Sequence, residues 1–212
     1  MTAPLNGVKI VELTSVVLGP YACQMLGDLG AEIVKIEPPS GDTNRNLGPF
    51  RTHKDMSSLF VNCNRNKRSL VLDLKSERGK AAALKTIEGA DIVVHNFRPA
   101  AMQRLGLDYE EVRKVNPQII YCATNGYSKK GPYGYKGALD DSIQAASGIA
   151  ALNDMVLGEP RYLPTVVADK TTGLFVVQAV LAALFHRERS GQGQEIEVPM
   201  FESLTSYVMV EH

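Results

Sequence analysis

The feature that most constrains the fold is a regular alternation between short runs of β-branched apolar residues and segments with helical periodicity. The run VKIVEL (8–13) precedes a helix-period segment at 20–30, and the run EIVKIE (32–37) follows that segment. Further strands are expected at 69–74, 91–96, 118–125, 162–168 and 194–200. Continuous Val, Ile and Leu runs are typical of strands buried on both faces. The sequence therefore predicts an α/β fold, a mostly parallel sheet with helices on both faces.

Composition narrows the classes of partner. The chain has 212 residues, 44% of them hydrophobic, and its 23 Lys plus Arg balance its 23 Asp plus Glu. This balance argues against nucleic acid or an anionic membrane as the main partner. The longest apolar run, near 174–185, is too short to span a bilayer, and the first residues lack the pattern of a signal peptide. The three cysteines are far apart without C-x-x-C spacing, which suits a reducing cytoplasm. No metal is expected, because the His and acidic residues lack ligand spacing.

The residues that follow each strand are the candidates for ligand binding. In an open parallel sheet, ligands bind beyond the carboxyl ends of the strands. A dinucleotide site is one interpretation, since Glu37 ends the second strand, but the first turn offers only Gly19-Pro20 in place of G-x-G-x-x-G. Two irregular stretches, 41–58 and 126–137, are rich in Gly, Pro and basic residues and are predicted to be functional loops.

Motifs in a fixed order over nearly the whole chain carry a family resemblance. They are LGAEIVKIEPPSGDTNR (29–45), NKRSLVLDLK (66–75), DIVVHNFRP (91–99), RLGLDY (104–109), QAASG (144–148), VADKTTG (167–173) and RSGQGQEIEVPMFES (189–203). With these motifs the chain resembles the N-terminal portion of a class III CoA-transferase, the family of formyl-CoA transferase and carnitine CoA-transferase. The resemblance implies a Rossmann-like large domain that takes coenzyme A or acyl-CoA as substrate and holds no permanent cofactor.

The resemblance also implies that Asp169 is the nucleophile. Its carboxylate attacks an acyl-CoA thioester to give an anhydride, and the released thiolate then forms an aspartyl-CoA thioester that passes CoA to a small carboxylic acid. A nucleophile where the predicted strand 162–168 meets the following helix would lie near backbone amides that stabilise negative charge. The structural alternative is that Asp169 is a helix N-cap.

Other positions match the CoA-contacting positions of the family. Arg and Lys suit the phosphates, Leu72 and Phe97 can cover the adenine, and the backbone of the first turn can lie along the thiol arm, although that apolar pair could equally be core. The implied CoA-binding residues are Val17, Leu18, Leu72, Lys75, Asn96, Phe97, Arg98, Arg104, Gly137, Ala138, Leu139 and Asp140. Arg65, Lys67 and Arg68 are interpreted as solvated charges at a strand entrance, and the Asp140-Asp141 pair as cap and surface.

Two departures from the family pattern bear on specificity. Formyl-transferring members carry glutamine and tyrosine where this chain has Val17 and Leu139, so formate and oxalate are not indicated as substrates. The related α-methylacyl-CoA racemases use a histidine at the position of Leu139 as an acid/base group, which leucine cannot replace. A racemase-like enzyme using a loop histidine such as His53 stays open as an alternative.

The length of the chain predicts how it is organised. Residues 1–198 are expected to form the CoA-binding large domain, and 199–212 to begin a helix towards a second domain that the family carries, together with a glycine-rich loop. We expect a homodimer, because that helix is apolar. A catalytically incomplete CoA-binding fragment is the alternative to an active transferase.

Overall fold

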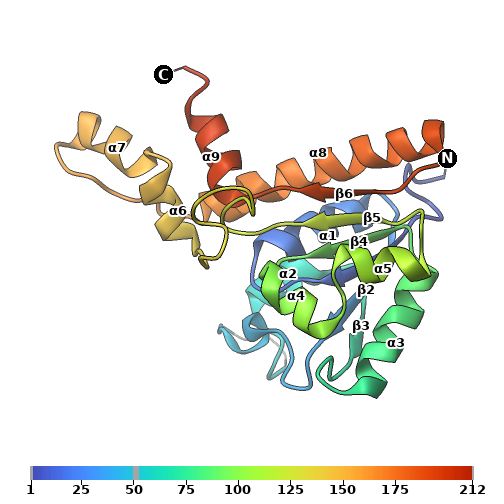
Figure 1. Cartoon of the computed structure of the whole chain (residues 1–212). Coiled ribbons are helices and arrows are strands. Elements are labelled where there is room, and N and C mark those ends of the chain that lie inside the picture. Colours follow the sequence, from blue (N-terminus) through green and yellow to red (C-terminus); the bar gives the residue numbers. More distant parts are fainter. Residues whose placement is uncertain (1, 50–52, 212) are drawn as a thin grey trace.

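A single sheet of parallel strands organises the molecule (Figure 1). The computed structural model describes residues 2–49 and 53–211. The strands are β1 (Lys9–Leu13), β2 (Glu32–Glu37), β3 (Lys67–Val71), β4 (Ile92–His95), β5 (Ile120–Ala123) and β6 (Gln194–Glu197). Their order is β3-β2-β1-β4-β5-β6, and every neighbouring pair is parallel. The order reverses between β1 and β4, which is where doubly wound sheets bind ligands. The predicted Rossmann-like parallel sheet is confirmed.

Two apolar layers cover the sheet because successive strand residues point to opposite faces. Ile10 of β1 packs into one layer and Val11 into the other. The first layer is formed by α1 (Leu18–Asp28) and α8 (Val167–Ser190), with α2 (Ser58–Asn64) against α1. The second is formed by α3 (Glu77–Glu88), α4 (Pro99–Leu105) and α5 (Tyr109–Val115). Ser76 caps α3, accepting a hydrogen bond from Gly79 N.

Helix α8 is longer than its apolar run suggested. Its 24 residues are long and apolar enough to cross a membrane by length and composition alone. Val176, Val180 and Ala183 are nevertheless buried in the core, and the helix packs against α1 and against α9 (Met200–Val208). In this structure α8 therefore acts as a core helix (Figure 1).

The expected strand at 162–168 is wrong. Residues 162–166 are irregular, and α8 already begins at Val167, so Asp169 lies inside the first helical turn. The β-branched residues there have no strand to pair with, because β6 occupies the sheet edge beside β5. The side chain of Gln144 instead binds this segment, accepting from Leu163 N at 2.8 Å and donating to Thr165 O at 3.2 Å. Tertiary contacts thus override β-propensity here.

Three helices were not predicted. They are α2, α6 (Asp140–Ala146) and α7 (Ile149–Leu157), and in Figure 1 the last two form an arm beside the sheet. The irregular character of 126–137 is confirmed. Within 41–58 the chain forms a 3-10 helix, η1 (Thr43–Asn46), and α2 begins at Ser58. Residues 50–52 of that stretch lie outside the described part.

Candidate active site

Two neighbouring cavities open at the carboxyl edge of the sheet. The larger, of about 630 Å³, lies beyond β1, β2 and β3 and beside α4. The smaller, of about 240 Å³, lies between the turn after β1, the loop 126–137 and the start of α8. Ser15 lines both cavities, so the turn after β1 is their shared wall. A long ligand that entered both would run along this turn.

The larger cavity combines cations with apolar side chains. Lys75 and Arg104, both predicted for phosphates, line it and are exposed to solvent. Leu72 and Phe97 line the same cavity, as their predicted role beside a flat base requires. This end of the site can therefore hold a multiply charged anion with an attached aromatic ring.

The smaller cavity contains the predicted nucleophile. Asp169 lines it, together with Leu18, Asn96, Arg98, Gly137, Ala138, Leu139 and Asp140. The guanidinium of Arg98 lies over Gly137 so closely that a Cβ there would come within 2.4 Å of Nη2. Arg98 therefore faces a different cavity from Lys75 and Arg104, although all three were predicted to bind phosphate.

Helix α6 positions the Asp169 segment. The Asp140 carboxylate accepts from Asp169 N at 2.9 Å and from Gln144 Nε2 at 2.6 Å. It thereby satisfies one of the amides left free in the first turn of α8. Asp169 itself is the third residue of α8 after the N-cap Val166, so the N-cap interpretation of Asp169 is wrong. Asp140, interpreted as a cap, is instead the buried first residue of α6 after the N-cap Leu139, whereas Asp141 is exposed as expected.

The environment of Asp169 makes its carboxyl group unusually basic. Burial and the nearby charge of Asp140 raise the pKa of Asp169 to about 7. Both effects disfavour the charged form of the carboxyl group. A perturbed carboxyl in a cavity is a functional-site signal. Once ionised, such a carboxylate is a better nucleophile than an exposed one, because it is poorly solvated.

Comparison with known proteins decides the family. The sequence profile of CoA-transferase family III matches residues 5–212. The chain belongs to CoA-transferase family III.

Relatives of this family-III chain are similar in sequence and in structure. An acetyl-CoA:oxalate CoA-transferase from Acetobacter aceti is 40% identical over 207 residues, which are 97% of this chain and 53% of that protein. A succinate–glutarate CoA-transferase from Agrobacterium fabrum is 38% identical over 205 residues, covering 94% and 51%. The crystal structure of a CAIB/BAIF family protein from Brucella suis superposes with a TM-score of 0.94 at 36% identity, covering 99% of this chain and 56% of that one. The chain spans about half the length of the curated relatives it matches.

Several residues differ from their expected places in this family-III site. Val17 lines neither cavity and is buried as the N-cap of α1, whereas Leu18, also buried, does line the smaller one. The Asn96 amide is engaged with Ser15, donating to its carbonyl at 2.9 Å and accepting from its N–H at 3.2 Å. Asn96 therefore fixes the turn after β1 to the turn after β4. His53 is exposed and lines neither cavity.

Lys67 and Glu37 form ion pairs within the fold, although the sequence suggested a solvated charge at Lys67 and a ligand contact at Glu37. Lys67 is buried, with Nζ 2.8 Å from Glu12 Oε2, so its interpretation as a solvated charge is wrong. Arg65 and Arg68 form exposed ion pairs, as expected for surface charges. Glu37 is held by Arg45 through two contacts of 2.7 Å. Burial alone would raise the pKa of Glu37, but hydrogen bonds from Arg45 and Ser69 and the Arg45 charge lower it to about 2.

Sequence reasoning missed some lining residues. Lys80 lies one helical turn after Ser76 and adds a cation to the larger cavity, and Lys136 adds one to the smaller. The signal for Lys80 was present in the spacing of Lys75 and Lys80 around a helix start. Gln144 was identified only as part of the QAASG motif, and its contacts with Leu163 and Thr165 were not predicted. Among residues 2–49 and 53–211, no cluster of three or more His, Cys, Asp or Glu side chains could hold a metal ion.

Proposed function

We propose that this chain is the CoA-binding part of an enzyme that transfers CoA from an acyl-CoA thioester to a small carboxylic acid, with Asp169 as the nucleophile. The observation that carries the proposal is the pairing of two cavities across Ser15, one lined by cations and one by a basic, half-buried carboxyl group. Family membership supports the same reaction class. Residues 1–198 are assigned to the large domain, and 199–212 to the start of the connection to a second domain.

The proposed binding mode spans both cavities. Lys75, Lys80 and Arg104 hold the phosphates in the larger cavity, while Leu72 and Phe97 cover the adenine. The uncharged pantetheine arm runs along Ser15 and Leu18 into the smaller cavity. This places the thioester beside Asp169. CoA acts as a substrate that arrives and leaves, so no permanent cofactor is invoked.

The chemistry conserves one activated bond throughout. The Asp169 carboxylate attacks the thioester carbonyl, the C–S bond breaks, and an acyl-aspartyl anhydride and CoA thiolate result. The thiolate attacks the aspartyl carbonyl, giving aspartyl-CoA and the free donor acid. The acceptor carboxylate then attacks aspartyl-CoA, and the released thiolate attacks the acceptor acyl carbon of the new anhydride. The product acyl-CoA leaves and the Asp169 carboxylate is restored.

The position of Asp169 in α8 favours these steps. The amino end of a helix carries partial positive charge, which stabilises a developing oxyanion. The hydrogen bond from Asp169 N to Asp140 fixes the backbone at the nucleophile. Two relatives are named for oxalate and for succinate and glutarate, which supports an acceptor of similar size. We propose a small carboxylic acid as the acceptor.

A racemase-like reaction has less support. It needs acid and base groups on both sides of the substrate α-carbon. Leu139 lines the smaller cavity at the position of the racemase histidine, and leucine carries no proton. His53, the other candidate, lines neither cavity. A chain that only binds CoA is the remaining alternative, and the trapping experiment below distinguishes it.

We further propose a cytoplasmic homodimer without nucleic-acid or membrane partners. Large apolar side chains are exposed along the outer helices, as an interface between copies would require. They include Met155 and Val156 of α7, Phe185 of α8 and Tyr207 of α9. The three cysteines are free and buried, which suits a reducing compartment. Sedimentation of the purified protein tests the assembly, and a monomer at micromolar concentration would contradict it.

Covalent trapping tests the proposed reaction. The full-length protein is incubated with several acyl-CoA thioesters, treated with hydroxylamine or borohydride, and mapped by peptide mass spectrometry. We expect a mass change confined to the peptide that holds Asp169, and none in Asp169→Asn. An unmodified Asp169 peptide in a protein that binds CoA would reject the transferase mechanism in favour of binding alone.

A further inference from the structure

The turn after β1 is held in a conformation that its sequence does not favour. Val16 has a φ of 70°, in the left-handed region, and it lines the smaller cavity beside Ser15. β-Branched residues rarely adopt this conformation, because Cβ crowds the backbone. Strained residues of this kind persist only where surrounding contacts hold them. The contacts that hold Val16 therefore bear on the shape of the site.

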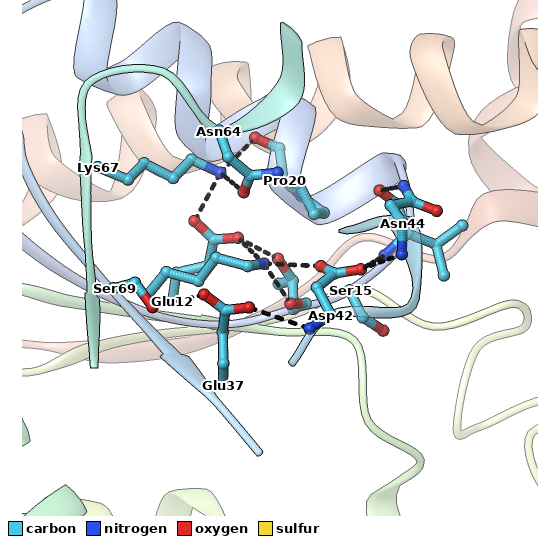
Figure 2. Close-up of polar contacts among 12 residues, drawn as sticks. Glu12, Ser15, Pro20, Glu37, Asp42, Asn44, Asn64, Lys67 and Ser69 are labelled. Atoms are coloured by element: carbon cyan, nitrogen blue, oxygen red, sulfur yellow. Dashed lines mark hydrogen bonds and ion pairs between the residues drawn. The ribbon is translucent and has the colours of Figure 1, made fainter. Parts of the chain in front are cut away.

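A buried ionic network lies directly beneath the turn (Figure 2). Lys35 Nζ is 2.9 Å from Glu12 Oε1 and 3.0 Å from Asp42 Oδ2, and it donates to Thr14 O at 2.7 Å. Glu12 and Lys35 face each other across β1 and β2. The side chains of Glu12, Lys35 and Asp42 are at most 1% exposed. This network fixes Asp42 against the end of β1.

The network continues from Asp42 to the strained residue. Asp42 Oδ1 accepts from Asn44 N at 2.9 Å and lies 3.5 Å from Val16 N. The Asn44 side-chain amide donates to Val16 O. Ser57 Oγ donates to Asn44 O, which ties η1 to the start of α2. Figure 2 shows Asp42, Asn44 and Ser15 close together, to the right of Glu12.

Asn96, in the turn after β4, also holds the turn after β1. Asn96 binds both the N–H and the carbonyl of Ser15. The N–H and carbonyl of Val16 face Asp42 and Asn44. Four backbone polar groups of two consecutive residues thus meet side chains from β2 and β4 loops. Such an arrangement fixes the backbone in both position and orientation.

We propose that Asp42 and Asn44, anchored by Lys35, are positioning residues for the transfer reaction. They hold Val16 in its left-handed conformation so that the shared wall of the two cavities guides the thioester onto Asp169. The proposal rests on the function proposed above. It also explains why three charges are buried where apolar residues would be simpler to accommodate. None of the three charged groups lines the smaller cavity, and only Asp42 lines the larger one, so each acts on the surroundings of Asp169 through the turn.

A double-mutant comparison at positions 16 and 44 tests the proposal in the full-length protein. Asn44→Ala removes the amide that holds Val16 O, and we expect kcat to fall roughly 10- to 100-fold, since small misplacements at a reacting centre have that effect. CoA affinity should stay within about twofold, because the phosphate contacts are untouched. The Tm should fall as well. Adding Val16→Gly to Asn44→Ala should restore part of both losses, because glycine adopts positive φ without strain.

Two further variants keep the test interpretable. Asp42→Asn removes the partner charge of Lys35 but keeps an acceptor for Asn44 N, and it should show the same kcat loss with the same rescue. Tyr121→Phe is the matched control, because it removes a buried hydrogen bond to Leu107 O in the other core layer. It should lower Tm and leave kcat unchanged.

The effect of adding Val16→Gly to Asn44→Ala decides whether the positioning role holds. Strictly additive effects of the changes at 16 and 44 on kcat and Tm would overturn the positioning role, as would an Asn44→Ala protein with lower Tm and normal kcat. A wild-type protein without transferase activity would contradict the proposed function alone. In that case the coupling in Tm between positions 16 and 44 still decides whether the network holds the turn.

Discussion

The two cavities differ in how their charges are presented. In the larger cavity Lys75 and Arg104 are exposed, and they come from the turn after β3 and from the last turn of α4. In the smaller cavity Asp140 is buried and Asp169 is half-buried, and they come from helices 29 positions apart in sequence. Exposed cations attract anions over a distance. Burial and the charge of Asp140 instead raise the pKa of Asp169 to about 7.

This difference suggests that the two cavities serve different functions. Water and salt screen the exposed cations of the larger cavity, so each contributes only modestly to the free energy of binding. The smaller cavity is less polar, so each charged group there has a larger electrostatic effect. Under the proposed function, the shared turn after β1 joins an end that anchors CoA and tolerates change to an end that reacts and does not. Substitutions in the two cavities should therefore have different sizes and affect different kinetic quantities.

Removing the nucleophile gives the largest expected effect. In Asp169→Ala, kcat should fall by at least about a thousandfold, because every covalent step passes through this carboxylate. CoA affinity, measured by calorimetry, should change by less than about twofold if anchoring is confined to the larger cavity. Asp154→Ala on exposed α7 is the control and should leave both quantities unchanged. A comparable loss of CoA affinity in Asp169→Ala would contradict the division between cavities.

Changing Asp140 tests how the reacting end is tuned. The raised pKa of Asp169 predicts that kcat/KM rises with pH through about 7, since the ionised form attacks. Asp140→Asn keeps an acceptor for Asp169 N but removes the negative charge, so the midpoint should move to lower pH. We expect kcat to fall roughly tenfold, as the hydrogen bond to Gln144 is disturbed.

The exposed neighbour Asp141 supplies the matched control for this experiment. Asp141 lies beside Asp140 in α6 but is exposed, so Asp141→Asn should leave the pH midpoint in place. The measurement is kcat/KM for the three proteins between about pH 5 and about pH 9. This range brackets the raised pKa of Asp169, about 7. An unmoved midpoint in Asp140→Asn would show that the Asp140 charge does not tune the nucleophile.

The sequence predicted the anchoring end far better than the reacting end. A parallel sheet brings the residues that follow its strands to one edge whatever the details of packing. Lys75, Phe97 and Arg104 could therefore be placed without a structure. The role of Asp140 could not, because it depends on a hydrogen bond between α6 and α8 and on burial that only the assembled fold produces.

The wrong strand at 162–168 has the same origin. Its Thr and Val residues favour a strand locally. Gln144, which lies in α6, takes the backbone groups of Leu163 and Thr165 instead. Lys67 was misjudged for a similar reason, since its buried partner Glu12 lies on β1. Local patterns identified the strands of the sheet but not α2, α6 and α7, and partners distant in sequence decided the polar contacts.

Substitutions at the anchoring end should have smaller effects. Arg104→Met and Lys80→Met should each weaken CoA binding about three- to tenfold at low ionic strength, and less at high salt, because exposed charge contacts are screened. Pantetheine, which lacks the nucleotide phosphates, should bind all variants equally. Lys85→Met, which breaks only an exposed ion pair with Glu88, is the control. Losses that persist at high salt, or that extend to pantetheine, would show that these residues do not act through phosphate.

The last expected effect is on the free energy of unfolding rather than on activity. It measures how much stability is lost when the buried Asp169 carboxyl group ionises in the folded protein. The pKa of Asp169 is raised to about 7 in the folded protein, from an ordinary value of 3.8, so the folded state binds its proton more tightly than the unfolded state does. Stability from this group is therefore fully present below about pH 4 and is lost as pH rises towards 7. Asp169→Asn cannot ionise and escapes that loss. Its Tm should match the wild type near pH 4 and exceed it by roughly 10 °C at pH 8, because the rise in pKa from 3.8 to about 7 corresponds to about 4 kcal/mol and a chain of this size changes by about 2–4 °C per kcal/mol. Thermal unfolding across this pH range measures the difference. A Tm advantage of Asp169→Asn that is constant with pH would mean that the carboxyl group is no harder to ionise in the fold than in water, and the contrast between the two cavities would then rest on geometry alone.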